Sequence, residues 1–221
     1  MSQGPSKIMI IRHGEKPAQY CGKTYQGVDV TAKKSGLDGA EDLVTIGWQR
    51  AGALVTLFAP PRGPVHGLAT PDFLYASDPS STKPGHSPSQ RPFETIVPLA
   101  AALGTRCKPM SINSSFKRDD YGGLVKDVLT RTGTVLISWQ HEAVPLMNGD
   151  KPPIPGISQH ILDATGSSNT FGIPSTWPKD RDGEDRYDLI WVFERSTSSG
   201  KITGFQILPQ FLLAGDSPYP L

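Results

Sequence analysis

The sequence predicts one α/β domain over residues 1–221, a three-layer αβα sandwich with a mostly parallel central sheet and a C-terminal antiparallel hairpin. Apolar runs typical of buried strands alternate with amphipathic segments typical of helices, which favours parallel strands with helices on both faces. Near the end of the chain, two strand patterns are separated only by a short turn that contains Ser-Ser-Gly. The 221 residues are enough for one sizeable core, and no internal repeat divides them.

The first strand, Ile8–Ile11, is a four-residue apolar run followed by Arg12-His13-Gly14. Ligands of open α/β sheets bind at the carboxyl ends of the strands. Arginine is always cationic and can bind two phosphate oxygens at once, and a neutral histidine has a nitrogen lone pair that can attack phosphorus. The tripeptide therefore predicts phosphoryl-transfer chemistry. The polar residues 15–42 that follow predict a long loop over the end of the strand.

A helix and a short strand are expected next. Thr45 can cap a helix that runs to Phe58, because apolar residues recur at i, i+3, i+4 and i+7 and two prolines follow. Residues 73–76 predict a strand that ends before Ser77-Asp78. The proline-rich residues 79–90 then predict an irregular loop.

Arg91 is predicted to open the second helix, with Pro92 in its first turn and Gly104 at its C′ position. The positive end of the helix dipole disfavours a cation there, so an anion bound between Arg91 and the free backbone N–H groups offsets that cost. The alternative is an ordinary surface arginine in a loop.

A third helix, capped by Asp119 or Asp120, is followed by a buried strand over residues 134–139. His141 comes shortly after this strand, as His13 comes after the first. Because parallel strands end at the same edge of a sheet, the two histidines are expected to face each other.

The last third of the chain is predicted to be irregular at first. Residues 144–186 are rich in loop-forming residues, with one short helix around 157–164, and are expected to shape the mouth of the site or to cover an edge of the sheet. Strands over 188–194 and 201–208 then form the hairpin.

Composition limits the functions that the chain can have. The 22 Lys and Arg against 21 Asp and Glu leave a formal charge of +1, which gives no footprint for nucleic acid and favours small-molecule partners. Cys21 and Cys107 have no metal-ligand spacing and are expected to be free thiols. The start of the chain is polar, and no stretch approaches the roughly 20 apolar residues of a membrane span. These features predict a cytoplasmic protein without cofactor or membrane contact, and none indicates an oligomeric state.

Several short motifs follow one another in a set order: Arg12-His13-Gly14, residues 45–51, Ser77-Asp78, Arg91-x-x-x-Thr95 and His141. This set resembles the histidine phosphatase superfamily, the phosphoglycerate-mutase-like proteins, over residues 7–142. Residues 45–51 look like the helix start that the family writes with Leu-Thr and then Gly, Gln and Ala.

The resemblance implies a phosphatase that hydrolyses a small phosphate monoester through a phosphohistidine on His13. Arg12, Arg91 and His141 are then expected to hold the phosphoryl oxygens. Phosphoryl transfer needs mainly in-line positioning and neutralised charge, which two guanidiniums and an imidazolium can supply without a metal ion. Two alternatives stay open: a mutase or transferase that uses the same intermediate, and a phosphate-binding module without turnover.

The leaving group needs a proton, and the sequence offers more than one donor for it. Glu142 matches the position of the acidic donor in the acid-phosphatase branch of the superfamily. The mutase-like branch takes its donor from elsewhere, and Glu15, Asp78 and Glu94 are the candidates. A carboxylate in the first turn of a helix is favoured by the dipole, so Glu94 has an equally good structural explanation.

The chain departs from the family in three respects, one of which is that it has no evident counterpart of the mutases' substrate-specific residues. Residues 79–90 form an insertion before the second arginine, and Lys16 stands where some acid-phosphatase relatives have another arginine. A metal site is disfavoured, because the His-Glu-x-x-His pattern that starts at His141 has Pro145 in place of its second histidine. A P-loop is excluded by Pro17, which stands where that motif needs glycine. The remaining histidines, His66, His86 and His160, are expected to be structural or solvated.

Overall fold

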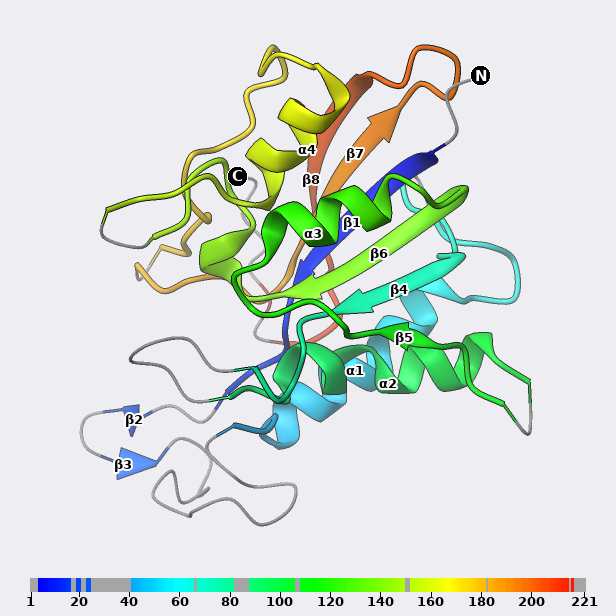
Figure 1. The fold of residues 1–221 in the computed structure, drawn as a ribbon. Helices are drawn as coiled ribbons and strands as arrows, with labels where there is room; N and C mark the ends of the chain where they lie inside the picture. Colours follow the sequence, from blue (N-terminus) through cyan, green and yellow to red (C-terminus); the bar gives the residue numbers. More distant parts are fainter. Residues whose placement is uncertain are drawn as a thin grey trace.

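The computed structural model describes residues 4–16, 19–20, 23–24, 41–65, 67–81, 88–105, 108–149, 152–181, 183–214 and 216. Within these residues the fold is α/β, with a six-stranded mixed sheet in the order β5-β4-β6-β1-β7-β8 (Figure 1). The strands of this sheet are β1 (Pro5–Arg12), β4 (Phe73–Ala76), β5 (Ile112–Asn113), β6 (Gly133–Trp139), β7 (Leu189–Arg195) and β8 (Ile202–Pro209). The helices are α1 (Thr45–Phe58), α2 (Arg91–Leu103), α3 (Tyr121–Val128) and α4 (Ile157–Thr165), with a 3-10 turn η2 (His141–Ala143).

The sheet combines a parallel half with an antiparallel half. Strands β5, β4, β6 and β1 pair in parallel, whereas β7 is antiparallel to both β1 and β8. The predicted hairpin is confirmed, and Gly200 in its turn has a positive φ of 74°, which glycine adopts without strain.

Helices cover both faces of the sheet. Side chains alternate along β1, so this strand contributes apolar residues to both faces. Ile8 and Ile10 belong to the apolar cluster that contains residues of α3 and α4, whereas Met9 and Ile11 belong to the cluster that contains residues of α1 and α2. All four side chains are fully buried. Figure 1 shows α1 and α2 on one side of the sheet and α3 and α4 on the other.

The predicted helix ends are right in one case and wrong in two. Asp120 caps α3, since its carboxylate accepts a hydrogen bond of 2.9 Å from Gly123 N. Thr45 does not cap α1: it is the first helical residue, and the cap position belongs to Val44, whose side chain cannot accept a hydrogen bond. Gly104 ends α2 with extended backbone, not at a left-handed C′ position. Glycine is needed there for space, because a Cβ would lie 2.5 Å from Pro109 Cα.

The predicted loop over residues 15–42 lies mostly outside the described residues, which include the short antiparallel pair β2 (Gln19–Tyr20) and β3 (Lys23–Thr24). Cys21, Cys107, His66, His86 and residues 82–87 of the 79–90 insertion also lie outside them. Among the helices of the described residues, none combines the length and hydropathy required to cross a bilayer.

Candidate active site

The ends of three parallel strands meet at one edge of the sheet. Arg12 is level with Trp139 in the β1–β6 pair, and Ala76 is level with Ser138 in the β4–β6 pair. His13 N donates a hydrogen bond of 3.0 Å to Trp139 O, which extends the ladder one residue beyond β1. The residues after these strands are therefore brought to the same place, as the sequence predicts.

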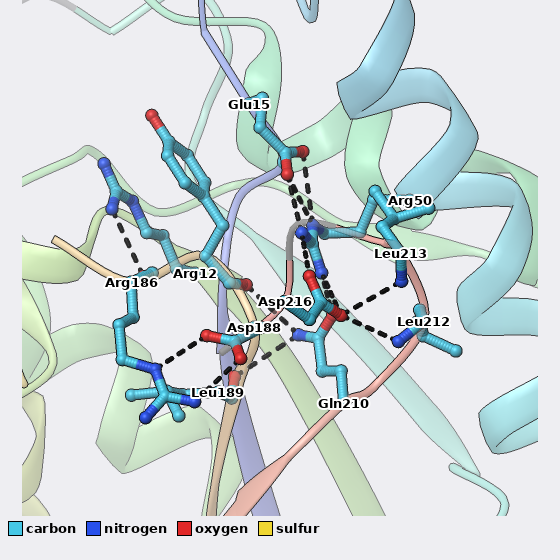
Figure 2. Close-up of polar contacts among 12 residues, drawn as sticks. Arg12, Glu15, Arg50, Arg186, Asp188, Leu189, Gln210, Leu212, Leu213 and Asp216 are labelled. Atoms are coloured by element: carbon cyan, nitrogen blue, oxygen red, sulfur yellow. Dashed lines mark hydrogen bonds and ion pairs between the residues drawn. The ribbon is translucent and has the colours of Figure 1, made fainter. Parts of the chain in front are cut away.

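Arg12 is buried at this edge, with 2% of its surface exposed. Its Nη1 donates hydrogen bonds to the carbonyl oxygens of Asp185 and Arg186, the second at 3.2 Å (Figure 2). The guanidinium lies 3.6 Å above the centre of the Tyr187 ring, a cation–π contact. Residues 185–187 thus hold the guanidinium in one orientation.

His13 has a defined tautomer. Its Nδ1 lies 2.7 Å from Gly14 O, and because a carbonyl oxygen can only accept, Nδ1 carries the hydrogen. The next peptide is also fixed, since Gly14 N donates to Thr95 Oγ1 at 2.8 Å and Thr95 Oγ1 donates to Arg91 O at 2.7 Å. In the neutral ring the lone pair is therefore on Nε2, and the first turn of α2 is tied to the end of β1.

Electrostatics keep His13 neutral. Burial of the ring, followed by the nearby charges of Arg91 and Arg12, lowers the pKa of His13 well below its ordinary value. His141 contributes in the same direction, so the three predicted phosphate-binding residues all lie within electrostatic range of His13. At neutral pH, His13 presents an unprotonated Nε2 beside two guanidiniums.

The two arginines concentrate positive charge in a place with little water. Burial lowers the pKa of Arg12 and of Arg91, and Arg118 acts on Arg91 in the same direction. Within the part of the chain that the structure describes, Arg12 Nε and His141 Nδ1 are buried side-chain nitrogens without a hydrogen-bond partner. Desolvated guanidiniums on one edge of the sheet, with an unpartnered Nε–H on Arg12, are suited to an oxoanion.

His141 lies between two carboxylates at the start of η2. Its Nε2 is 2.9 Å from Asp185 Oδ2, and its Nδ1 is 3.2 Å from Glu142 Oε2, outside hydrogen-bond geometry. Burial and the charge of Arg12 lower the pKa of His141 to about 4, despite the two acidic neighbours. In this state the ring is neutral, and a bound anion would favour its protonated form.

Glu142 is held in the ionised form. Burial opposes ionisation, but the protonated form of His141 and the ion pair with Arg118, at 3.0 Å, lower the pKa of Glu142 overall. Its carboxylate is positioned by Arg118 on one side and His141 on the other.

The other candidate proton donors have structural partners. Glu15 binds Arg50 at 2.6 Å, and Asp78 accepts two hydrogen bonds from Ser80 within its own turn. Glu94 accepts a hydrogen bond of 2.8 Å from Leu43 N, while burial and a neighbouring acid, Asp42, raise the pKa of Glu94 to about 7. These contacts favour structural roles for Glu15 and Asp78, whereas a pKa near neutrality keeps Glu94 a candidate proton donor.

Arg118, Asp185 and Tyr187 are site residues that sequence reasoning missed. The carbonyl of Asp185 meets Arg12 across 173 positions of the chain, so no local pattern could connect them. Lys16 is close enough for Arg12 and Arg91, after burial, to lower its pKa.

A buried ion network is centred on Arg50 (Figure 2). Arg50 of α1 binds Glu15 at 2.6 Å and Asp216 at 2.7 Å, and its Nη1 donates to Gln210 Oε1 at 3.0 Å. Despite burial, these hydrogen bonds raise the pKa of Arg50. Through Arg50 the network joins Glu15, two positions after His13, to α1 and to Gln210 and Asp216.

A pocket of about 410 Å³ adjoins the site. His141, Glu142 and Asp185 line it on one side, and most of its other residues come from the 144–186 segment. Over the described residues, no group of three or more His, Cys, Asp or Glu side chains is arranged to hold a metal ion. His160 lies elsewhere, against Tyr121, with 6.3 Å between ring centres. No protein-family model matches the chain, and no curated protein is similar to it.

Proposed function

We propose that the chain is a phosphatase that hydrolyses phosphate monoesters through a phosphohistidine on His13. The observation that carries the proposal is the neutral His13, whose Nδ1 donates to Gly14 O and whose ring is close enough to Arg12, Arg91 and His141 for their charges to lower its pKa. A nucleophile for phosphorus needs such a lone pair, and a phosphoryl group needs cations around its equatorial oxygens.

The reaction has two displacements. Nε2 of His13 attacks phosphorus, the bond between phosphorus and the ester oxygen breaks, and that oxygen takes a proton from Glu142. A water molecule then attacks the phosphohistidine, its proton passes to Glu142, and the phosphorus–nitrogen bond breaks to release phosphate. The two guanidiniums hold the equatorial oxygens in both steps, so no metal ion is required for charge neutralisation.

Glu142 must be protonated when the ester bond breaks. A phosphate dianion brought next to His141 and Glu142 raises the pKa of both groups, because it adds negative charge beside them. The proton that the leaving group needs is therefore taken up together with the substrate and is shared between Nδ1 of His141 and the Glu142 carboxylate, 3.2 Å apart.

The arrangement of helices on both faces of the sheet supports the three-layer fold of phosphoglycerate-mutase-like proteins, in which we place this chain. The small charge imbalance supports a small-molecule substrate with no nucleic-acid partner. The proposed location is the cytoplasm.

The test is hydrolysis of a generic aryl phosphate between pH 5 and 8 in the presence of a chelator. The parent chain and His160→Ala are expected to turn over, and His13→Ala is not. His160 is the matched control because it is in α4 and packs against Tyr121 of α3, outside the site. Turnover that disappears with the chelator, or that survives in His13→Ala, contradicts the phosphohistidine mechanism.

Product analysis separates this function from the alternatives of the same site. Release of free phosphate supports the phosphatase, and movement of the phosphoryl group to another hydroxyl supports a mutase or transferase. Vanadate binding without any turnover indicates a binding module.

A further inference from the structure

The pocket of about 410 Å³ has no role in the phosphoryl chemistry described above, yet it shares three side chains with that site. His141, Glu142 and Asp185 line the pocket, and Glu142 is the group that protonates the ester oxygen in the proposed reaction. A leaving group whose oxygen is next to Glu142 therefore has its remaining atoms in or near this pocket.

The wall of the pocket is apolar and rigid. The Trp177 ring stacks on Trp191 with 5.4 Å between centres and an interplanar angle of 5°, and its Nε1 donates to Arg186 O at 2.8 Å. The Trp177 ring is 6.4 Å from the His141 ring, so the apolar surface begins beside the phosphate-binding group. Pro145, Met147 and Pro153 extend it.

The charges that line the pocket disfavour a second acid. Glu142 and Asp185 are both acidic, and Lys179 is the basic residue of the lining. Lys179 is largely exposed, its Nζ donates to Gly183 O at 2.9 Å, and it lies 3.8 Å from Asp185 Oδ1, so its charge is already opposed. Arg118, the partner of Glu142, does not line the pocket.

We propose that this pocket is the leaving-group subsite, and that it takes an uncharged, ring-bearing alcohol in preference to one that carries a carboxylate or a second phosphate. The inference rests on the proposed phosphatase function and names its substrate class. A volume of about 410 Å³ lies in the range of small-molecule sites, which combine apolar walls with a few polar groups.

The test compares two primary-alkyl monoesters whose alcohols have similar acidity, 2-phenylethyl phosphate and 2-carboxyethyl phosphate, by release of inorganic phosphate. The parent is expected to have a kcat/KM at least tenfold higher for the phenylethyl ester. Met147→Trp, which fills the pocket, is expected to reduce that kcat/KM at least tenfold while the Kd for vanadate changes less than twofold. Ile154→Trp places the same side chain on a partly exposed position outside the lining and is expected to retain the parent values.

The outcomes distinguish this inference from the function on which it rests. Equal kcat/KM for the two esters, or a preference that persists in Met147→Trp, overturns the leaving-group subsite and leaves the phosphatase intact. Absence of both vanadate binding and phosphate release in the parent overturns both.

Discussion

Replacing Arg50 with methionine tests the buried ion network most directly. The guanidinium binds Glu15 at 2.6 Å and Asp216 at 2.7 Å, and the exposed fractions of the three side chains are 4%, 15% and 2%. Methionine retains much of the apolar stem and removes the charge. Two carboxylates then stay buried without their cation.

The magnitude follows from that burial. Removing one partner of a buried ion pair typically costs about 3–5 kcal/mol, because the remaining charge is desolvated and uncompensated. For a chain of 150–250 residues, each 1 kcal/mol lowers Tm by about 2–4 °C. Arg50→Met is therefore expected to lower Tm by about 6–20 °C. The loss of about 3–5 kcal/mol is a large part of the roughly 5–15 kcal/mol that stabilises a typical domain.

The assay is thermal unfolding at pH 7, followed by far-UV circular dichroism. Arg62→Met removes an exposed arginine from the loop after α1 and is the control, with an expected change within about 0.5 kcal/mol. In Arg50→Met/Asp216→Asn the Asp216 carboxylate, one of the two that lose their cation, is also replaced. The double variant is therefore expected to lose less stability than the sum of the single variants. Equal Tm for Arg50→Met and Arg62→Met, or strict additivity in the double variant, refutes the reasoning.

Three further predictions concern Gly47, the cap of α3 and His13. A Cβ at Gly47 would lie 2.7 Å from Glu15 O, so Gly47→Ala is expected to lower aryl phosphate hydrolysis by displacing the loop after His13. Gly52→Ala is the control: its Cβ meets no atom within 4 Å, and the change should stabilise α1 by about 0.5–1 kcal/mol. Loss of the α3 cap in Asp120→Ala is expected to cost about 1 kcal/mol in urea unfolding, whereas Asp119→Ala should cost little. Because burial and the arginine charges lower the pKa of His13 in the folded chain, the unfolded chain binds a proton below pH 6.5 that the folded chain does not. That part of the stability is present above pH 6.5 and is lost as the pH falls, so from pH 7 to 5.5 the free energy of unfolding must fall more steeply in the parent than in His13→Gln; parallel curves would contradict the shifted pKa.

Most of the fold was predictable because patterns within short segments of the sequence determine its strands and helices. The apolar run Ile8–Ile11 and the stripe of α1 identify buried strand and amphipathic helix by their periods alone, and the hairpin follows from two strands around a glycine turn. The cap at Thr45 and the C′ position at Gly104 were predicted wrongly. The sequence offers a plausible residue at both positions, but the backbone there is decided by packing, at Gly104 by the approach of Pro109.

The sequence by itself determined which residues reach the edge of the sheet. Arg12 and His13 follow one strand and His141 follows another, and the parallel order that brings them together is implied by the alternation of strands and helices. Tertiary structure alone decided the contacts that set their chemistry. The carboxylate of Asp185 on His141, the Tyr187 ring on Arg12 and the pairing of Arg118 with Glu142 join segments 24 to 175 positions apart, and burial and charge act through space, not along the chain.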